Sequence, residues 1–443
     1  MNRRSFFNTA AGIATAPAAC AGKKTETHGG SGRPGTVMEI AGMPIGALRE
    51  RYRGDMFDRF LPFMDKFVID HRYGGFMCST MPDGTNVSTG KRAVFEGRGV
   101  WVYSHLYSHL AREQKYLDAA QRSVDLLMRH RPEPPSLWPA RFTREGEIDA
   151  PPSDSVNADL YIADGLQAFA AATGDDAWWK TAKDILIKCL YVYDGDDYGA
   201  GRGRDYLGKD EPLTPGVRIM DDWMLFLWTA TQMLVQKSDM DLLMIVTQCL
   251  DTIMNRFYNR ETGLVRELLD HDYTPYDNDL DQLVNFGNDF QAIWHVMAAA
   301  NRIDNHDQFV TASEHLRRHI EVSWDDVYGG MLNLLANVDE NRWRLGKSHY
   351  VQVEPLIGLM MVIENLGPQW AFDWFGRIYA YEQEKFHLEQ YGYPFWMNSA
   401  DRKATFDFDR SRRIGDFHQP RHLMLVLESL DRCIERNAAD DGS

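Results

Sequence analysis

Six polar residues recur at a nearly constant spacing along the 443-residue chain, each near the start of a helix-like apolar run. They are Arg98, Asn157, Asp222, Asn288, Glu354 and His418. The intervals between them are 157−98 = 59, 222−157 = 65, 288−222 = 66, 354−288 = 66 and 418−354 = 64 residues. Arginine binds anions, histidine exchanges protons near neutral pH, and amides and carboxylates bind hydroxyls. Brought together, these side chains would form a polar pocket for a hydroxyl-rich small molecule.

The spacing also predicts the elements that position these residues. About 60 residues form one helix, a loop and a returning helix, so six such units predict a ring of helical hairpins. Leu160–Ala172, Trp223–Val235 and Leu356–Leu366 are apolar nearly all round, whereas Tyr116–His130 and Gln308–Val322 are amphipathic. Buried helices alternating with half-exposed ones indicate two layers. We therefore predict an all-α fold, an (α/α)6 barrel of six inner and six outer helices over residues 36–443.

The first 35 residues differ from the rest, and Ala21–Gly35 has the composition of a flexible tether. Arg3-Arg4, followed by the weakly apolar Thr9–Ala19, resembles a twin-arginine (Tat) export signal. The end of this stretch resembles a lipobox and would allow a lipid anchor at Cys20, although Pro17 is unusual there. We expect an exported, periplasmic protein, the alternative being an unstructured N-terminus. No later segment has the roughly 18 apolar residues of a transmembrane span.

Composition excludes several other classes of protein. The formal net charge is −16 without a block of Lys or Arg, so we expect no nucleic-acid partner. Apart from Cys20, the cysteines have no Cys-x-x-Cys spacing, which argues against a zinc site or a disulfide framework. There is no Gly-x-Ser-x-Gly elbow of a serine hydrolase and no His-Glu-x-x-His pair. We expect neither a metal nor a cofactor in the chemistry.

Among the 14 histidines, His418 stands out because it opens the last apolar helix, with Pro420 just inside the helix start. A proline at this position fixes the entry geometry of the chain, so the imidazole would be held rigidly. Most other histidines are predicted to be surface or packing residues on amphipathic or outer helices. They include His105, His109, His130, His306, His315 and His319.

Five motifs, in order along residues 70–430, resemble those of the N-acylglucosamine 2-epimerase superfamily, which includes cellobiose 2-epimerases. They are Tyr73–Phe76 with the following Asp-Gly, Val94–Tyr103 (Gln-Gly-Arg-x-x-Trp in the family), Gly287–Ala292 (Gly-His-Asp-Ile-Glu-Ala), Lys347–Glu354 (Lys-x-Trp-Trp-Val-Gln-x-Glu) and Phe417–Arg421 (His-Val-Pro-Arg). The family fold is an (α/α)6 barrel, in agreement with the spacing above.

The resemblance implies proton abstraction beside the carbonyl of an open-chain sugar. Two histidines on opposite sides of C2 exchange protons through an enediolate in this family, and an arginine stabilises the oxyanion. By resemblance, His418 would be one acid/base, Arg98 would hold the enediolate oxygen, and Glu354 would bind hydroxyls or orient a base. Further residues are expected to bind the carbohydrate: Asn157, Asp159, Asp222, Asn288, Gln291, His349 and Trp101.

Departures from the family pattern bear on the second base. Asn288 stands where the family has its other histidine, and Gln291 replaces a glutamate one turn later. Asp159 replaces a further histidine of the cellobiose epimerases, and His349 with its neighbour replaces their paired tryptophans. Because an amide cannot take up a proton near neutral pH, Asn288 is not a base.

Three alternatives follow. His418 alone could move a proton between C2 and C1, which would give aldose–ketose isomerisation. His349 or Asp159 could have taken over the second proton transfer, which would preserve epimerisation. Alternatively, the barrel is an exported carbohydrate-binding or glycan-processing protein, such as a hydrolase or lyase using Asp159, Asp222 or Glu354. We expect a sugar epimerase or isomerase as the leading function.

Overall fold

The computed structural model describes residues 35–81, 83–199, 214–388, 393–394, 397–399 and 417–441. The predicted export signal and Cys20 lie outside these described residues. Within the described part of the chain, none of the helices is long and apolar enough to cross a membrane.

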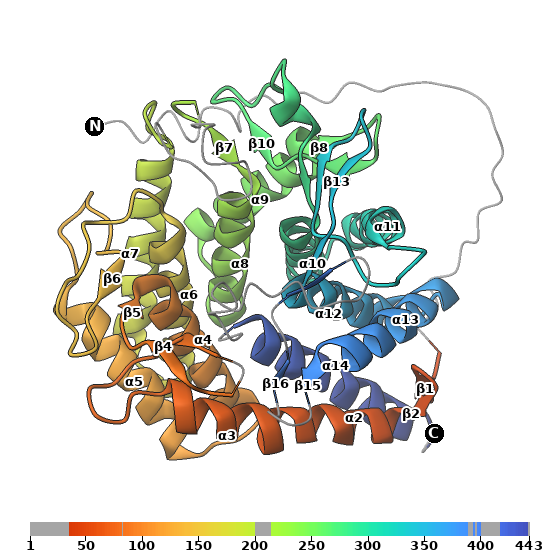
Figure 1. Ribbon diagram of the computed structural model, residues 1–443, viewed down its shortest axis with the longest axis horizontal. Coiled ribbons are helices and arrows are strands. Elements are labelled where there is room, and N and C mark those ends of the chain that lie inside the picture. Colours follow the sequence, from red (N-terminus) through yellow and green to blue (C-terminus); the bar gives the residue numbers. More distant parts are fainter. Residues whose placement is uncertain are drawn as a thin grey trace.

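Six helices of the described chain form an inner ring, each packed against the next (Figure 1). They are α4 (Ala93–His109), α6 (Asn157–Thr173), α8 (Met220–Gln236), α10 (Phe286–Arg302), α12 (His349–Asn365) and α14 (His418–Asp441). Each carries one of the six evenly spaced polar residues within its first two turns. The inner layer predicted from the spacing is confirmed.

A second layer of helices surrounds this ring. It consists of α5 (Gln114–Arg129), α7 (Asp176–Tyr193), α9 (Met240–Asp251) continued by η4 (Thr252–Phe257), α11 (His306–Ser323), α13 (Gln369–Lys385), and α2 (Ile45–Gly54) continued by η2 (Asp55–Phe60), α3 (Leu61–Phe63) and η3 (Met64–Val68). The outer helices are amphipathic: α5, for example, buries Tyr116, Ala120, Val124 and Leu127, which recur every three or four residues. With α2 packed against α14, the two layers form the predicted (α/α)6 barrel.

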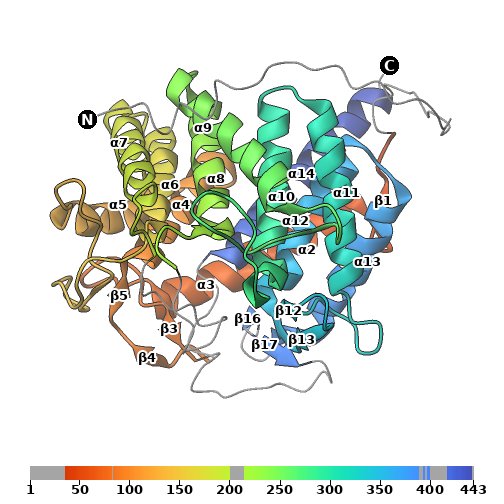
Figure 2. The ribbon, with the colours of Figure 1, turned by 90° about the horizontal axis from the view of Figure 1, so that it is seen from above.

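Short antiparallel strands and one 3-10 turn occupy the loops, and most strands gather at one end of the barrel (Figure 2). The pairs are β1 (Glu39–Ile40) with β2 (Met43–Pro44), β3 (Ser79–Thr80) with β4 (Asn86–Ser88), β5 (Lys91–Arg92) with β6 (Arg141–Phe142), β7 (Arg218–Ile219) with β10 (Leu268–Leu269), β8 (Tyr258–Asn259) with β9 (Leu264–Val265), β12 (Leu334–Asn337) with both β11 (Val284–Asn285) and β13 (Arg342–Arg344), β14 (Gly346–Ser348) with β17 (Met397–Ser399), and β15 (His387–Leu388) with β16 (Tyr393–Pro394); the 3-10 turn is η5 (Asp279–Gln282). Because β5, β7, β11 and β14 lead directly into inner helices, they fix where those helices begin. We call this end the mouth.

Two loops at the mouth are built alike although they lie 325−70 = 255 residues apart. The carboxylate of Asp70 accepts backbone N–H groups two and three residues later at 3.1 and 3.2 Å, and that of Asp325 does the same at 3.0 Å for both. A buried lysine pairs with each aspartate, Lys91 at 3.3 Å and Lys347 at 2.7 Å. These pairs anchor the loops to the starts of α4 and α12.

One turn into each of these two helices, a buried polar side chain accepts a hydrogen bond from the backbone of the loop. Glu96 Oε1 accepts the N–H of Phe76 at 2.9 Å, and Gln352 Oε1 accepts the N–H of Met331 at 2.8 Å. The residues two positions further along the helices are Arg98 and Glu354. The two candidate residues therefore occupy equivalent places in two hairpins of the ring.

The closest crossing in the inner ring is between α4 and α6, and it depends on two glycines. A Cβ atom on Gly97 would lie 2.7 Å from the backbone nitrogen of Ile162, and one on Gly165 would lie 2.5 Å from the carbonyl oxygen of Gly97. Only glycine allows this approach. It brings Arg98, the residue after Gly97, to within hydrogen-bond distance of Tyr161 on α6.

Candidate active site

His418 and Glu354 form the centre of the candidate site. His418 is the first residue of α14, and its Nδ1 lies 2.7 Å from Oε1 of Glu354 in α12. Both side chains are buried, with 7% and 0% of their surface exposed. The regular spacing predicted that these two residues share the mouth, and the structure places them in direct contact.

Glu354 is also bound by two groups from further inner helices. Arg421 Nη2 donates to the same Oε1 at 2.7 Å, and Trp294 Nε1 donates to Oε2 at 2.9 Å. Burial acts to raise the pKa of Glu354, but the adjacent Arg421 and the hydrogen bond from His418 outweigh it and lower the pKa to about 2. Glu354 is therefore an anion at any working pH and can only accept hydrogen bonds.

This anion fixes the proton of His418. Because the carboxylate must accept, Nδ1 of His418 carries the hydrogen and Nε2 keeps its lone pair. Burial, with a smaller contribution from the nearby Arg98 and Arg421, outweighs the opposing effect of Glu354 and lowers the pKa of His418 to about 3. The imidazole is consequently neutral at neutral pH, and its Nε2 carries no proton.

Arg98 projects from α4 and is 8% exposed. Its Nη2 donates to the hydroxyl of Tyr161 at 2.8 Å, and its guanidinium lies over the rings of Tyr161 and Phe417, at 4.1 and 5.1 Å from their centroids. The Nε atom is buried without a hydrogen-bond partner among the described residues. With Asn157, Arg98 lines a depression of ≈ 820 Å³. A fixed cation with an unused donor suits the stabilisation of an oxyanion.

Asn288 and Gln291 lie one turn apart on α10. The amide of Asn288 donates to both oxygens of the buried Glu267, at 3.1 and 3.3 Å. Gln291 Oε1 accepts from Arg421 Nη2 at 2.8 Å, which joins Gln291 to the His418–Glu354 pair through Arg421. Each of the two amides is therefore bound to a buried charged side chain, Glu267 for Asn288 and Arg421 for Gln291.

The other predicted binding residues contact different partners. Asp159 pairs with Lys188 of α7 at 2.5 Å, and His349 Nε2 lies 2.9 Å from Glu382 Oε1 of α13. Both side chains are therefore directed toward the outer layer. Asp222 accepts from the hydroxyl of Tyr198 at 2.8 Å. Trp101 is 1% exposed and packs edge-on against Phe417 with ring centroids 5.7 Å apart.

Three residues of this site were not identified from the sequence: Arg421, Glu267 and Trp294. Arg421 lies in the Phe417–Arg421 motif, so an arginine one turn after His418 was a usable signal. Glu267 follows Arg266 in the segment Leu264–Leu269, whose other four residues are apolar, so burial of one of the two charges was a usable signal. Trp294 gives no such signal, because tryptophans are common in buried helices.

Comparisons with solved structures agree with this geometry. The cellobiose 2-epimerase of Bacillus thermoamylovorans superposes with a TM-score of 0.72 at 16% sequence identity, covering 86% of this chain and 99% of that chain. A D-mannose isomerase superposes with a TM-score of 0.67 at 13% identity, covering 87% and 97%. The fold is thus one used by sugar epimerases and isomerases.

The sequence comparisons specify the family. The N-acylglucosamine 2-epimerase family matches residues 74–412, and the chain belongs to this family of sugar epimerases and isomerases. The N-acylglucosamine 2-epimerase of Bos taurus is 23% identical over 394 residues, which cover 86% of this chain and 91% of that protein. The human enzyme is 22% identical over 422 residues, covering 90% and 94%.

Proposed function

We propose that this protein is an aldose–ketose isomerase that transfers a proton at C2 of an open-chain sugar. Nε2 of His418 takes the proton from C2, and the electron pair of the broken C–H bond forms the enediolate double bond between C1 and C2. Arg98 stabilises the negative charge that develops on O1. His418 then returns the proton to C1, while the proton of the C2 hydroxyl moves to O1, which leaves a carbonyl at C2.

The observation that carries this proposal is the 2.7 Å contact between Nδ1 of His418 and the ionised Glu354. This contact places the ring proton on Nδ1 and leaves Nε2 with a lone pair, as a general base requires. Glu354 acts through His418 and is therefore a positioning residue.

The contacts of the other candidate bases favour a mechanism in which His418 is the single base. Asn288 has no proton-accepting atom of suitable basicity, and its amide is engaged by Glu267. His349 and Asp159 are held by Glu382 and Lys188 on the outer side of the inner ring. One base that serves one face of the sugar supports isomerisation between C2 and C1. Both isomerisation and epimerisation occur in the names of the similar structures, which include a D-mannose isomerase and a cellobiose 2-epimerase.

The proposal is tested by incubating the protein with a panel of aldoses and ketoses in deuterated water. We expect ketose formation from at least one aldose, with deuterium incorporated at C1 or C2. His418→Gln should abolish both, and His306→Gln, which changes an exposed histidine of α11, should abolish neither. Tight sugar binding without turnover or exchange by the wild-type protein would instead support the carbohydrate-binding alternative.

Asn288 offers a second test, because its side chain contacts the carboxylate of Glu267 as His418 contacts that of Glu354. A histidine at position 288 would gain a carboxylate partner and could act as a second base. We expect Asn288→His, alone or with Gln291→Glu, to add C2 epimerisation to the product mixture. Products unchanged in a well-folded Asn288→His protein that binds sugar would show that position 288 does not face C2.

We further propose that the chain is exported through a twin-arginine signal and acts in the periplasm. The Arg3-Arg4 pair and the weakly apolar stretch after it support this, and Cys20 is the candidate for lipid attachment. Replacing Arg3 and Arg4 by lysine should retain the protein in the cytoplasmic fraction. Cys20→Ala should leave export intact and remove any incorporated lipid label.

A further inference from the structure

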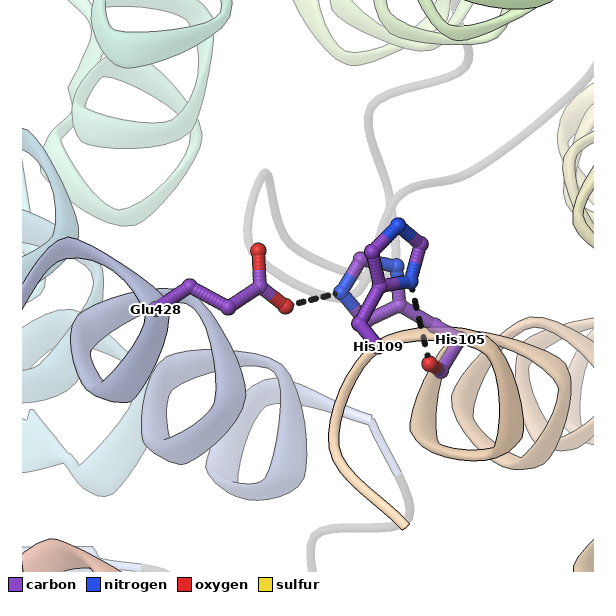
Figure 3. Close-up of side chains that lie close together, drawn as sticks. All are labelled: His105, His109 and Glu428. Atoms are coloured by element: carbon purple, nitrogen blue, oxygen red, sulfur yellow. Dashed lines mark hydrogen bonds and ion pairs between the residues drawn. The ribbon is translucent and has the colours of Figure 1, made fainter. Parts of the chain in front are cut away.

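A second cluster of ionisable side chains lies away from the mouth, between the first and last inner helices. It consists of His105 and His109 near the end of α4 and Glu428 in α14 (Figure 3). His105 Nε2 lies 2.5 Å from Glu428 Oε1, and the two imidazole rings are stacked with centroids 4.1 Å apart. The prediction that these histidines lie on amphipathic or outer helices is wrong, because α4 is an inner helix.

The cluster presents its nitrogen and oxygen atoms in a form that suits a metal. One candidate ligand atom from each residue lies within 4.8 Å of the others. His109 Nδ1 is 3.1 Å from the carbonyl oxygen of His105 and donates to it, so His109 Nε2 keeps its lone pair. Trp101 stacks on the His105 ring with centroids 4.7 Å apart and fixes its plane.

The carboxylate of Glu428 faces the edge of the His105 ring (Figure 3), so its oxygen atoms and the imidazole nitrogens lie between the two helices.

We propose that His105, His109 and Glu428 bind one divalent transition-metal ion, with zinc the preferred metal. Two histidines four residues apart on a helix place their rings on one face, and a His2Glu set is a known zinc ligand set. Metal–ligand bonds of about 2.0–2.2 Å need the three atoms closer together than 4.8 Å, so the His109 and Glu428 side chains must rotate toward the ion when it binds. The nitrogen ligands disfavour calcium and magnesium, which prefer oxygen.

The position of the cluster points to a structural metal that acts apart from the sugar chemistry. Glu428 lies 428−418 = 10 residues along α14 from His418, which is about 15 Å of helix. His105 and Glu428 are separated by 323 residues in the sequence, yet they join the two helices that close the ring. An ion bound there would stabilise the closed barrel, because the unfolded chain has no such site.

The test uses the full chain without a polyhistidine tag, dialysed against a chelator. Cobalt is titrated while its visible absorption is recorded, and zinc is then added to displace it. We expect one equivalent of cobalt to bind, zinc to compete for the same site, and the unfolding temperature to rise with free zinc. His109→Ala and Glu428→Gln should each abolish binding, whereas His306→Ala should not. His109 is exposed, so its replacement should not impair folding, which circular dichroism checks.

Three results would overturn the proposal. The first is absence of cobalt or zinc uptake by the wild-type protein. The second is unchanged uptake by folded His109→Ala and Glu428→Gln proteins, which would leave the contact between His105 and Glu428 as an ordinary buried hydrogen bond. The third is loss of uptake in His271→Ala, since His271 lies in an exposed acidic turn, Asp270–Asp272, that could also attract a cation.

Discussion

His418 and Glu354 lie on neighbouring inner helices, and one oxygen of the glutamate accepts hydrogen bonds from both the imidazole of His418 and the guanidinium of Arg421. The carboxylate thus holds the proton on one side of the imidazole and compensates a fully buried arginine. Orientation of the base and stability of the barrel depend on the same side chain.

Glu354→Gln is expected to weaken the fold as well as the chemistry. It leaves Arg421 buried without a neutralising anion, a change that typically costs about 3–5 kcal/mol of unfolding free energy. Urea unfolding of the variant measures this cost. The matched control is Asp184→Asn, which breaks the exposed pair with Lys180 and should change stability by about 0.5 kcal/mol or less. Equal losses in both variants would contradict a buried ionic role for Glu354.

Asp159→Asn separates the structural interpretation of Asp159 from the catalytic one. Asp159 pairs with the buried Lys188, so the variant should lower the unfolding free energy while the kcat of the remaining folded protein stays near wild type. Loss of isotope exchange in a protein of unchanged stability would instead make Asp159 the second base.

Acidification should destabilise the protein because buried histidines are held neutral. Burial lowers the pKa of His319 to about 3, and that of His418 also lies at about 3. Since unfolded histidine titrates near 6.5, the unfolded state binds these protons first as the pH falls. The stabilisation is complete above pH 6.5 and is lost progressively toward pH 3, at up to about 1.4 kcal/mol per pH unit for each histidine. Urea unfolding between pH 7 and 4.5 checks the slope, and His319→Gln should reduce it.

Gly97→Ala should disrupt the crossing of α4 and α6. The added Cβ would meet the backbone of α6 at 2.7 Å, and because backbone cannot rotate away, we expect a loss of about 1–3 kcal/mol together with weaker sugar turnover through the displaced Arg98. Gly46→Ala in α2 is the control, because its Cβ would meet nothing within 4 Å and alanine favours helix. Thermal melting of both variants distinguishes the two; a Gly97→Ala protein as stable as Gly46→Ala would contradict the close crossing.

The periodicity of the sequence predicted the inner ring because one polar residue marks each inner helix near its start. It did not predict which face of a helix each side chain uses, although the helical repeat contains that information. His349 and Glu354 are five residues apart, about 140° around the helix, so one faces α13 while the other faces the ring interior. Asn157 and Asp159 differ by about 200° for the same reason.

The partners themselves were beyond prediction from one sequence. Lys188 with Asp159, Glu267 with Asn288, and Arg421 with Gln291 join residues that lie 29, 21 and 130 positions apart. Such pairs depend on how hairpins pack, and no local pattern specifies them. The resemblance to a family supplied the candidate reacting groups, whereas the hydrogen bonds around them came only from the structure.

The duplicated loops at Asp70 and Asp325 have an implication for how this barrel could diversify. Asp70, Lys91 and Glu96 hold one hairpin, and Asp325, Lys347 and Gln352 hold its counterpart. Asn288 belongs to neither set, and its side chain contacts Glu267 of another hairpin. A histidine and an asparagine can therefore replace one another at position 288 while both loops keep their contacts, so the reaction of such a barrel can change without loss of the frame.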